Sequence, residues 1–303
     1  MGKKRSWICA ALVLSMAAAA AGGCASGYAS RAESADATYG GTPASDGLVL
    51  VKGGTFRNAN SNYYGGEIII EDFYIGKYEV TQREWTAVMG YNPSRFKGDD
   101  LPVDSVSWYE AIEYCNRRSL MEGLEPYYNI DKSRRDPDNR SEIDTVKWIV
   151  TINEGANGYR LPTEQEWEYA AAGGPKSRGY KYSGGNRPDE VSWNWRNAGD
   201  RDLEGGWSWQ SIENNGNRTR PVGGKKANEL GIHDMSGNVR EWCWDWYEDE
   251  FVEPGHFRVV RGGGWLGDIH TLEIAFRGMF EANGIGPDQG FRVARNADPG
   301  TAG

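Results

Sequence analysis

The stretch "RPVGGKKANELGIHDMSGNVREWCWDWY", residues 220–247, decides the fold of this chain. Its centre, "HDMSGNVREW", predicts a tight turn at Gly237, because glycine accepts backbone angles that other residues resist. Asp234 and Glu241 place a carboxylate on either side of that turn. Such a turn either binds a cation through its oxygens or is closed without an ion by a cap or a salt bridge.

Regular structure is predicted mainly outside this stretch. Ser or Thr followed three residues later by Glu, the capping-box spacing, marks three helix starts. These starts pair Thr81 with Glu84, Ser107 with Glu110, and Thr163 with Glu166. Alternating apolar runs predict strands in residues 47–57, 67–79, 127–130 and 146–152.

Residues 175–228 are rich in Gly, Asn, Trp and Arg and show little periodicity. Long irregular segments inside a domain are typical of binding surfaces or metal-pinned loops. The pattern as a whole predicts one loop-rich α+β domain over residues 47–297, with a short tail at 298–303.

Composition excludes one class of partner. The 303 residues carry a net charge of −9, and 13 of them are Trp. Binding to nucleic-acid phosphates requires clustered Lys and Arg, so we expect no nucleic-acid partner.

The N-terminus has the pattern of an export signal. A basic start, an apolar run too short for a span of about 20 residues and small residues before Cys24 predict a signal peptide over residues 1–23. The residues before Cys24 resemble a relaxed bacterial lipoprotein cleavage site, which implies that Cys24 carries the lipid. Ordinary secretory cleavage, with Cys24 incidental, is the alternative. The small, polar residues 24–46 suit a flexible tether.

Two cysteines remain in the expected domain, Cys115 and Cys243. They would form a disulfide in an oxidising compartment if they were in contact, or stay as buried free thiols. The spacing does not decide between these two states.

Four ordered segments carry a family resemblance. They are "GYRLPTEQEWEYAAAGG" (158–174), the opening stretch, "RVVRGGGW" (258–265) and "GFRVAR" (290–295). Together they resemble the formylglycine-generating enzymes, or sulfatase-modifying factors. The resemblance implies a C-type lectin-type fold with little regular secondary structure. It also implies a structural calcium site at Asp234, Gly237, Val239 and Glu241, or the same turn without an ion.

The same resemblance argues against catalysis. The family's enzymes bind copper through a cysteine pair just after the Arg-Gly-Gly motif, and no cysteine follows Cys243 here. Thiolates are the ligands that copper(I) needs. His233, His256 and His270 are the chain's three histidines, and they lack the spacing of the histidine-rich iron site of the sulfoxide-synthase branch. We therefore expect no enzyme activity and no required cofactor.

A second resemblance concerns the C-terminal segment. Variable proteins of diversity-generating retroelements share RGGxW, a changeable middle containing Ala-x-Arg, and a closing GFR. This chain has these elements within residues 258–295, and its lipoprotein signal makes it especially similar to the variable lipoproteins of treponemal spirochaetes. The resemblance implies a fixed frame, made by Arg261, Gly262, Gly263, Trp265, Arg277 and Phe291.

The positions inside that frame would bind the ligand. Adenine-directed mutation of an Asn codon reaches Leu, Gly, Asp, Ile, His and Phe, but not Glu, Met or Gln. The candidate variable positions are therefore Leu266, Gly267, Asp268, His270, Leu272, Phe276, Phe280, Asn283 and Ile285. We expect them to project from the scaffold. Apolar anchors would be Leu266, Leu272, Phe276 and Phe280, and polar discrimination would come from Asp268, His270 and Asn283. The alternative is that the apolar members are core residues.

The function expected from these patterns is that of a non-catalytic binding lipoprotein. It would be a monomer on the outer surface of the bacterial cell envelope, anchored to the membrane by its lipid alone. Its partner would be a protein or another surface ligand. The alternative is an accessory protein, or an enzyme with altered chemistry, in the sulfatase-modifying-factor family. A glycan-binding lectin is a third reading, although no sugar-binding calcium site can be placed.

Overall fold

The computed structural model describes residues 47–57 and 66–297, all within one compact unit of the chain, Thr42–Gly303. Cys24, the predicted signal peptide and the predicted tether lie outside the described residues. Within the described ranges, no helix combines the length and apolar character needed to span a membrane.

The three predicted helix starts are confirmed. Helices α1 (Gln82–Met89), α2 (Trp108–Met121) and α3 (Glu164–Ala171) each begin after a complete capping box. In each box the Ser or Thr side chain accepts from the backbone N–H three residues on, and that residue's carboxylate accepts from the cap's own N–H. The first helix ends at Gly90, whose φ of 82° suits glycine.

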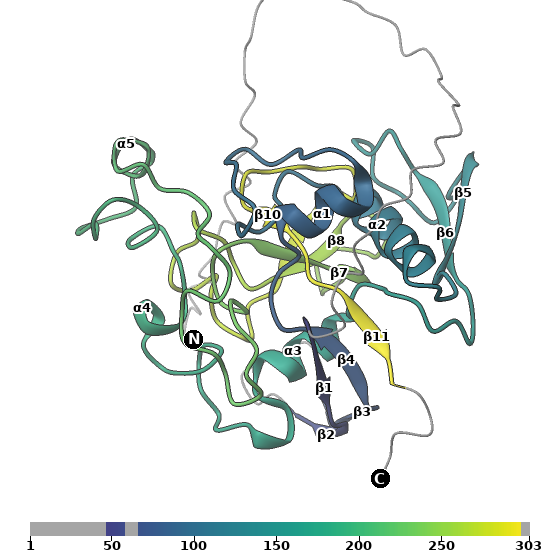
Figure 1. Cartoon of the computed structure of the whole chain (residues 1–303), viewed down its shortest axis with the longest axis horizontal. Helices are drawn as coiled ribbons and strands as arrows, with labels where there is room; N and C mark the ends of the chain where they lie inside the picture. The colour runs from purple at the N-terminus through teal and green to yellow at the C-terminus, as the bar shows by residue number, and fades with distance from the viewer. Residues whose placement is uncertain (1–46, 58–65, 298–303) are drawn as a thin grey trace, which may run out of the picture. The chain divides into compact units, whose positions relative to one another are not determined.

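A three-stranded antiparallel sheet joins the two ends of the domain, in the order β1-β4-β11. These strands are β1 (Leu48–Val51), β4 (Phe73–Gly76) and β11 (Ala294–Asn296). Figure 1 shows β11, at the yellow end of the chain, beside the purple and blue strands of the first hundred residues. Beside it, β2 (Gly54–Phe56) pairs with β3 (Ile68–Ile70). The predicted opening strand is therefore interrupted at its Gly-Gly pair, where a Cβ on Gly53 would lie 2.2 Å from the Ile70 carbonyl oxygen.

The four-stranded sheet carries the opening stretch of sequence. Its order is β10-β7-β8-β9, with β10 parallel to β7. The strands are β7 (Arg240–Trp246), β8 (Arg258–Arg261), β9 (Gly278–Phe280) and β10 (Gln289–Gly290). A separate hairpin pairs β5 (Tyr128–Arg135) with β6 (Trp148–Ile152). Both hairpin strands were expected, although β5 runs five residues beyond the predicted Ile130.

Aromatic side chains fill the core. Trp85 stacks on Tyr114 with ring centroids 5.5 Å apart, and Phe291 packs edge-on against both rings. Next to Phe291, the buried guanidinium of Arg292 donates to both oxygens of Glu241, at 2.6 and 2.7 Å. The C-terminal segment is therefore part of the core and holds the Gly237 turn in place.

Asparagine side chains organise the irregular segment 175–228. It contains only short helices: η2 (Gly174–Lys176), α4 (Pro188–Val191) and α5 (Trp209–Asn214). The buried Asn217 amide donates to the Trp195 carbonyl at 2.7 Å, and Asn238 donates to the Arg220 carbonyl at 3.1 Å. These amides replace the hydrogen bonds that a sheet or helix would supply, which lets the green loops of Figure 1 keep a defined course.

Candidate ligand-binding surface

The segment from Trp265 to Gly286 begins at a backbone corner that only glycine suits. Gly262 and Gly263 have φ values of 86° and 67°. A Cβ on Gly263 would lie 2.8 Å from the Thr271 carbonyl oxygen. Trp265 then donates its backbone N–H to the Asn238 carbonyl and its indole N–H to the Pro287 carbonyl, at 2.7 and 2.9 Å. The corner is thereby fixed to the Gly237 turn on one side and to the end of the segment on the other.

Two arginines attach the middle of the segment to α3. Arg261 is fully buried, forms an ion pair with Glu168 and donates to the carbonyls of Ile274 and Phe276 at 2.8 and 2.7 Å. Arg277 binds both oxygens of Glu164, at 2.6 and 2.8 Å. The course of the segment therefore depends on buried charges and main-chain contacts.

The nine candidate variable positions differ in their exposure. Asp268, His270, Phe276 and Ile285 are exposed, whereas Leu266, Gly267, Phe280 and Asn283 are half-buried. Leu272 is fully buried against Tyr182 and Val191. The expectation that all nine project from the scaffold is therefore wrong for Leu272, which is a core residue.

Two further candidate positions, Gly267 and Phe280, contribute to the structure of the segment. A Cβ on Gly267 would lie 2.6 Å from the Thr271 hydroxyl oxygen and 2.9 Å from the Gly264 carbonyl oxygen, so a side chain there requires a shift of the backbone. The Phe280 ring packs on Trp242 with centroids 6.0 Å apart, and the Arg240 guanidinium lies 4.8 Å from its centroid. Of the four apolar anchors expected from the sequence, Phe276 is the exposed one, at 39%. Ile285, a candidate variable position outside that set, is 60% exposed.

A charged group lies beside the exposed positions. His270 Nδ1 lies 3.0 Å from the Glu273 carboxylate, and the Lys181 ammonium lies 2.9 Å from the same oxygen. The Lys181 pKa is raised by its hydrogen bond to Glu273. Phe276 lies next to this group, because its N–H donates to the Glu273 carbonyl at 2.9 Å.

Trp207 contacts the segment at Leu266, and the sequence did not single it out. Its indole N–H donates to the Leu266 carbonyl at 3.1 Å, and 43% of the side chain is exposed. It comes from the irregular segment 175–228, whose composition indicated a binding surface without identifying residues. Leu266 itself packs on a small cluster formed by Trp195, Ala198, Ile212 and Trp265.

A buried carboxyl lies behind the end of the segment. Asp104 is fully buried, and one of its oxygens has no hydrogen-bond partner among the described residues. The neighbouring Ser105 donates its N–H to the Gly286 carbonyl at 2.9 Å. Burial raises the Asp104 pKa to about 6, although hydrogen bonds from Arg95 and Ser105 oppose the shift.

The residues proposed from resemblance for calcium do not fit that ion in this arrangement. Both oxygens of Glu241 are engaged by Arg292, and one also accepts from the Trp167 indole at 2.7 Å. Asp234 binds the Gly223 N–H at 2.6 Å through one oxygen, while its other oxygen is buried without a partner. Gly237, with a φ of 88°, and the buried Val239 shape the turn. No group of three or more His, Cys, Asp or Glu residues suited to a metal occurs in the described part of the chain.

The two cysteines are buried free thiols, which settles the alternative left open by the sequence. Burial raises the pKa of both thiols well above the usual range. A thiol in that state is a poor nucleophile and a poor metal ligand, because both roles need the thiolate.

The glycine corner, the buried arginine clamps and the loop-rich α+β architecture define a family. A model of the sulfatase-modifying factor enzyme 1-like domain matches residues 34–297, and the chain belongs to this family. Its fold is the C-type lectin-like fold of the formylglycine-generating enzymes, as the sequence resemblance implied.

Individual relatives differ in how much of the chain they share. The chain is 59% identical over 263 residues to the chaperone protein LppX of Paenibacillus barcinonensis, covering 87% of this chain and 94% of that protein. The structure of Treponema denticola variable protein 1 is 30% identical, with a TM-score of 0.66, covering 82% of this chain and 95% of that one. The formylglycine-generating enzyme of Streptomyces coelicolor is 33% identical over 165 residues, which cover 46% of this chain and 48% of the enzyme.

Proposed function

We propose that this protein is a non-catalytic lipoprotein of the bacterial cell envelope that binds a polypeptide through the surface around Trp207, Phe276 and Ile285. The main observation behind the proposal is that buried contacts hold the backbone of the segment from Trp265 to Gly286, while its exposed apolar side chains take no part in those contacts. Exposed aromatic and aliphatic groups on a fixed backbone are typical of protein-binding surfaces. The extensive similarity to a protein named as a chaperone supports a polypeptide as the ligand.

Two observations favour binding over catalysis. The segment after the glycine corner contains no cysteine, and the two thiols of the domain are buried with raised pKa values. The similarity to a variable protein over most of both chains is a further argument for a binding role.

The test uses insulin as the client polypeptide, because reduction of its disulfides exposes apolar surface. Insulin aggregates when its disulfides are reduced, and the free cysteines of this protein are already thiols. We expect the purified protein to delay the rise in light scattering, and Ile285→Ser to weaken that effect. Ile69→Ser is the matched control, because Ile69 is 83% exposed on the distant strand β3. Equal protection by both variants would show that the proposed surface is not the binding site.

The membrane anchor is tested separately. We propose that lipid on Cys24 holds the protein to the envelope, at the outer surface of the cell. A Cys24→Ala variant expressed in the native host should lose radiolabelled palmitate and move from the membrane fraction to a soluble fraction. Retention of label in the variant would refute lipidation at this residue.

Diversification by a retroelement is a second, finer proposal about the same surface. It is supported by the order of Arg261–Trp265, Ala275–Arg277 and Gly290–Arg292, and by the exposure of Asp268 and His270. Sequencing the 3′ end of the gene in sibling isolates should then find substitutions at adenines of the exposed positions. An invariant segment with no nearby repeat or reverse transcriptase would reject diversification and leave polypeptide binding untouched.

A further inference from the structure

A second site is indicated by the way the buried arginines are paired. Five arginines of the described chain are almost completely buried: Arg118, Arg160, Arg258, Arg261 and Arg292. Four of them form ion pairs with Glu side chains, as buried charges require. Arg258 has no ion pair with any Asp or Glu among the described residues, although its exposure is only 5%.

Aromatic rings hold the Arg258 guanidinium in a fixed plane. Its central carbon lies 3.7 Å from the Trp108 ring centroid and 3.6 Å from that of Trp246. One terminal nitrogen donates to the Trp244 carbonyl at 2.7 Å, whereas Nε has no hydrogen-bond partner in the described part of the chain. Cation–π contacts compensate part of the buried charge but do not satisfy the remaining donors.

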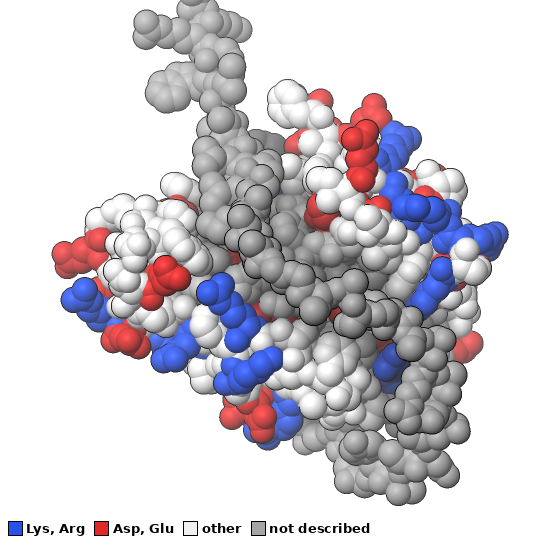
Figure 2. Space-filling view, turned by 90° about the horizontal axis from the view of Figure 1, so that it is seen from above, with Lys and Arg blue, Asp and Glu red and all other residues white. Residues whose placement is uncertain are grey.

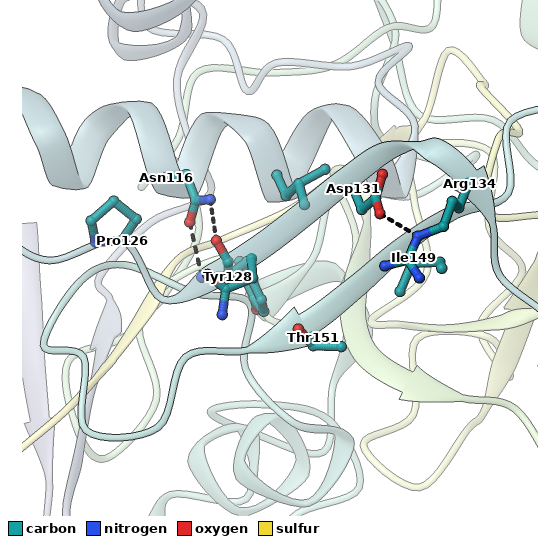
Figure 3. A pocket seen from close by; sticks show the side chains of 9 residues that line it. Asn116, Pro126, Tyr128, Asp131, Arg134, Ile149 and Thr151 are labelled. Atoms are coloured by element: carbon teal, nitrogen blue, oxygen red, sulfur yellow. Dashed lines mark hydrogen bonds and ion pairs between the residues drawn. The ribbon is translucent and has the colours of Figure 1, made fainter.

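This guanidinium lines a pocket between the β5–β6 hairpin and strands β7 and β8. The cavity has a volume of about 530 Å³, within the usual range for small-molecule sites. Its walls include Val150 and Thr151 of β6 and the two tryptophans Trp244 and Trp246. A neighbouring pocket, drawn in Figure 3, shares Arg134, Ile149 and Thr151 with it, so both hollows border the same hairpin.

The charges around this pocket define the ligand further. Lys132, Arg134 and Arg135 are exposed on β5, where Lys132 pairs with Glu113 and Arg134 with Asp131. Figure 2 shows basic and acidic side chains interspersed over the face that it presents. Burial lowers the Arg258 pKa to about 9, while the nearby Tyr109, Asp245 and Asp136 act in the opposite direction.

Three carboxylates also line the cavity, those of Asp136, Asp138 and Asp245. The Asp245 carboxylate is bonded instead to the Glu164 N–H, at 2.6 Å. The three aspartates are acceptors, so they favour a ligand with O–H or N–H donors beside its acidic group.

We propose that this pocket binds a ligand carboxylate flanked by hydrogen-bond donors, with the guanidinium of Arg258 as its counter-ion. A carboxylate supplies the planar pair of acceptors that a guanidinium matches. An acidic peptide and a sugar acid both carry this chemistry. The site is separate from the surface around Phe276, so the proposal of a carboxylate site does not depend on the proposed function.

The test compares charged probes with uncharged partners of the same shape. The probes are glucuronate against glucose, and the peptide acetyl-Gly-Asp-Gly-amide against its Asn counterpart, titrated into the purified full-length protein. Tryptophan fluorescence reports binding, since Trp244 and Trp246 line the pocket. At least one carboxylate probe should bind about tenfold or more tightly than its uncharged partner. This factor corresponds to the free energy of one charge-assisted hydrogen bond. The probe that binds identifies the source of the carboxylate.

Variants assign the effect to Arg258. Arg258→Gln should weaken binding of the preferred probe by about tenfold or more, whereas Arg187→Gln, at an exposed arginine that does not line the pocket, should change it by less than about threefold. If the Gln variant does not fold, Arg258→Lys keeps the charge but loses the paired donors and should still weaken binding. The proposal is overturned if neither carboxylate probe exceeds its partner, or if a folded Arg258 variant binds as well as the wild type.

Discussion

The strongest structural prediction concerns Arg261, which attaches the candidate binding segment to α3. The change Arg261→Met takes the arginine away from the buried carboxylate of Glu168 and removes two donors to main-chain carbonyls. Breaking a buried ion pair costs about 3–5 kcal/mol, and each lost hydrogen bond adds about 1 kcal/mol. We expect the free energy of unfolding to fall by about 5–7 kcal/mol, a large part of a typical domain's total of about 5–15 kcal/mol.

Urea unfolding followed by tryptophan fluorescence measures this loss. Adding Glu168→Gln to Arg261→Met removes the buried carboxylate charge that Arg261 neutralises and should restore about 2 kcal/mol. The matched control is Arg187→Met, because Arg187 is 80% exposed where it pairs with Glu190 and should change stability by less than about 0.5 kcal/mol. A loss below about 1 kcal/mol in the single variant, or a double variant less stable than the single one, would refute the reasoning.

Three further predictions separate core from surface. Leu272→Ala should lower the free energy of unfolding by about 2–5 kcal/mol, because the Leu272 side chain is fully buried. Phe276→Ala should lower it by less than about 1 kcal/mol, because the Phe276 side chain is exposed. Similar losses for the two variants in urea titrations would contradict this assignment. The Asp104 pKa is raised to about 6 from 3.8, so the native state holds this proton more tightly and loses stability as the pH rises from about 4 to about 6. Asp104→Asn should therefore leave stability unchanged at pH 4 and raise it by up to about 3 kcal/mol at pH 8; an equal effect at both pH values would exclude titration of this carboxyl as the cause. Cys115 and Cys243 should react with a thiol reagent only after denaturant is added, and rapid labelling of the native protein would show that one of them is accessible.

Local signals explain why the fold was largely predictable. The boxes at Thr81, Ser107 and Thr163 need contacts only within one helical turn, so the sequence contains all the information that starts each helix. The overall architecture depended on the order of long motifs rather than on periodicity. No local pattern predicts that Ala294 pairs with Ile75.

The candidate site was predicted less completely, because exposure depends on distant contacts. The codons reachable from Asn define residue types and do not distinguish Leu272 from Phe276. Tyr182 and Val191, about 90 and 80 residues earlier, cover Leu272 and leave Phe276 open. The contribution of Trp207 was missed for the same reason, since its bond to Leu266 joins residues 59 positions apart.

The pairing of β4 with β11 has a consequence for the timing of folding. Arg292 donates to the Gly76 carbonyl across 216 positions of sequence, and the adjacent strand completes the β1-β4-β11 sheet. Contacts this distant form slowly, because the long intervening chain must first be closed into a loop. Until residues 289–296 have emerged, one edge of β4 has no partner and Glu241 lacks the guanidinium that neutralises it. We therefore expect the β1-β4-β11 sheet and the Glu241–Arg292 ion pair to form only after residues 289–296 have been synthesised.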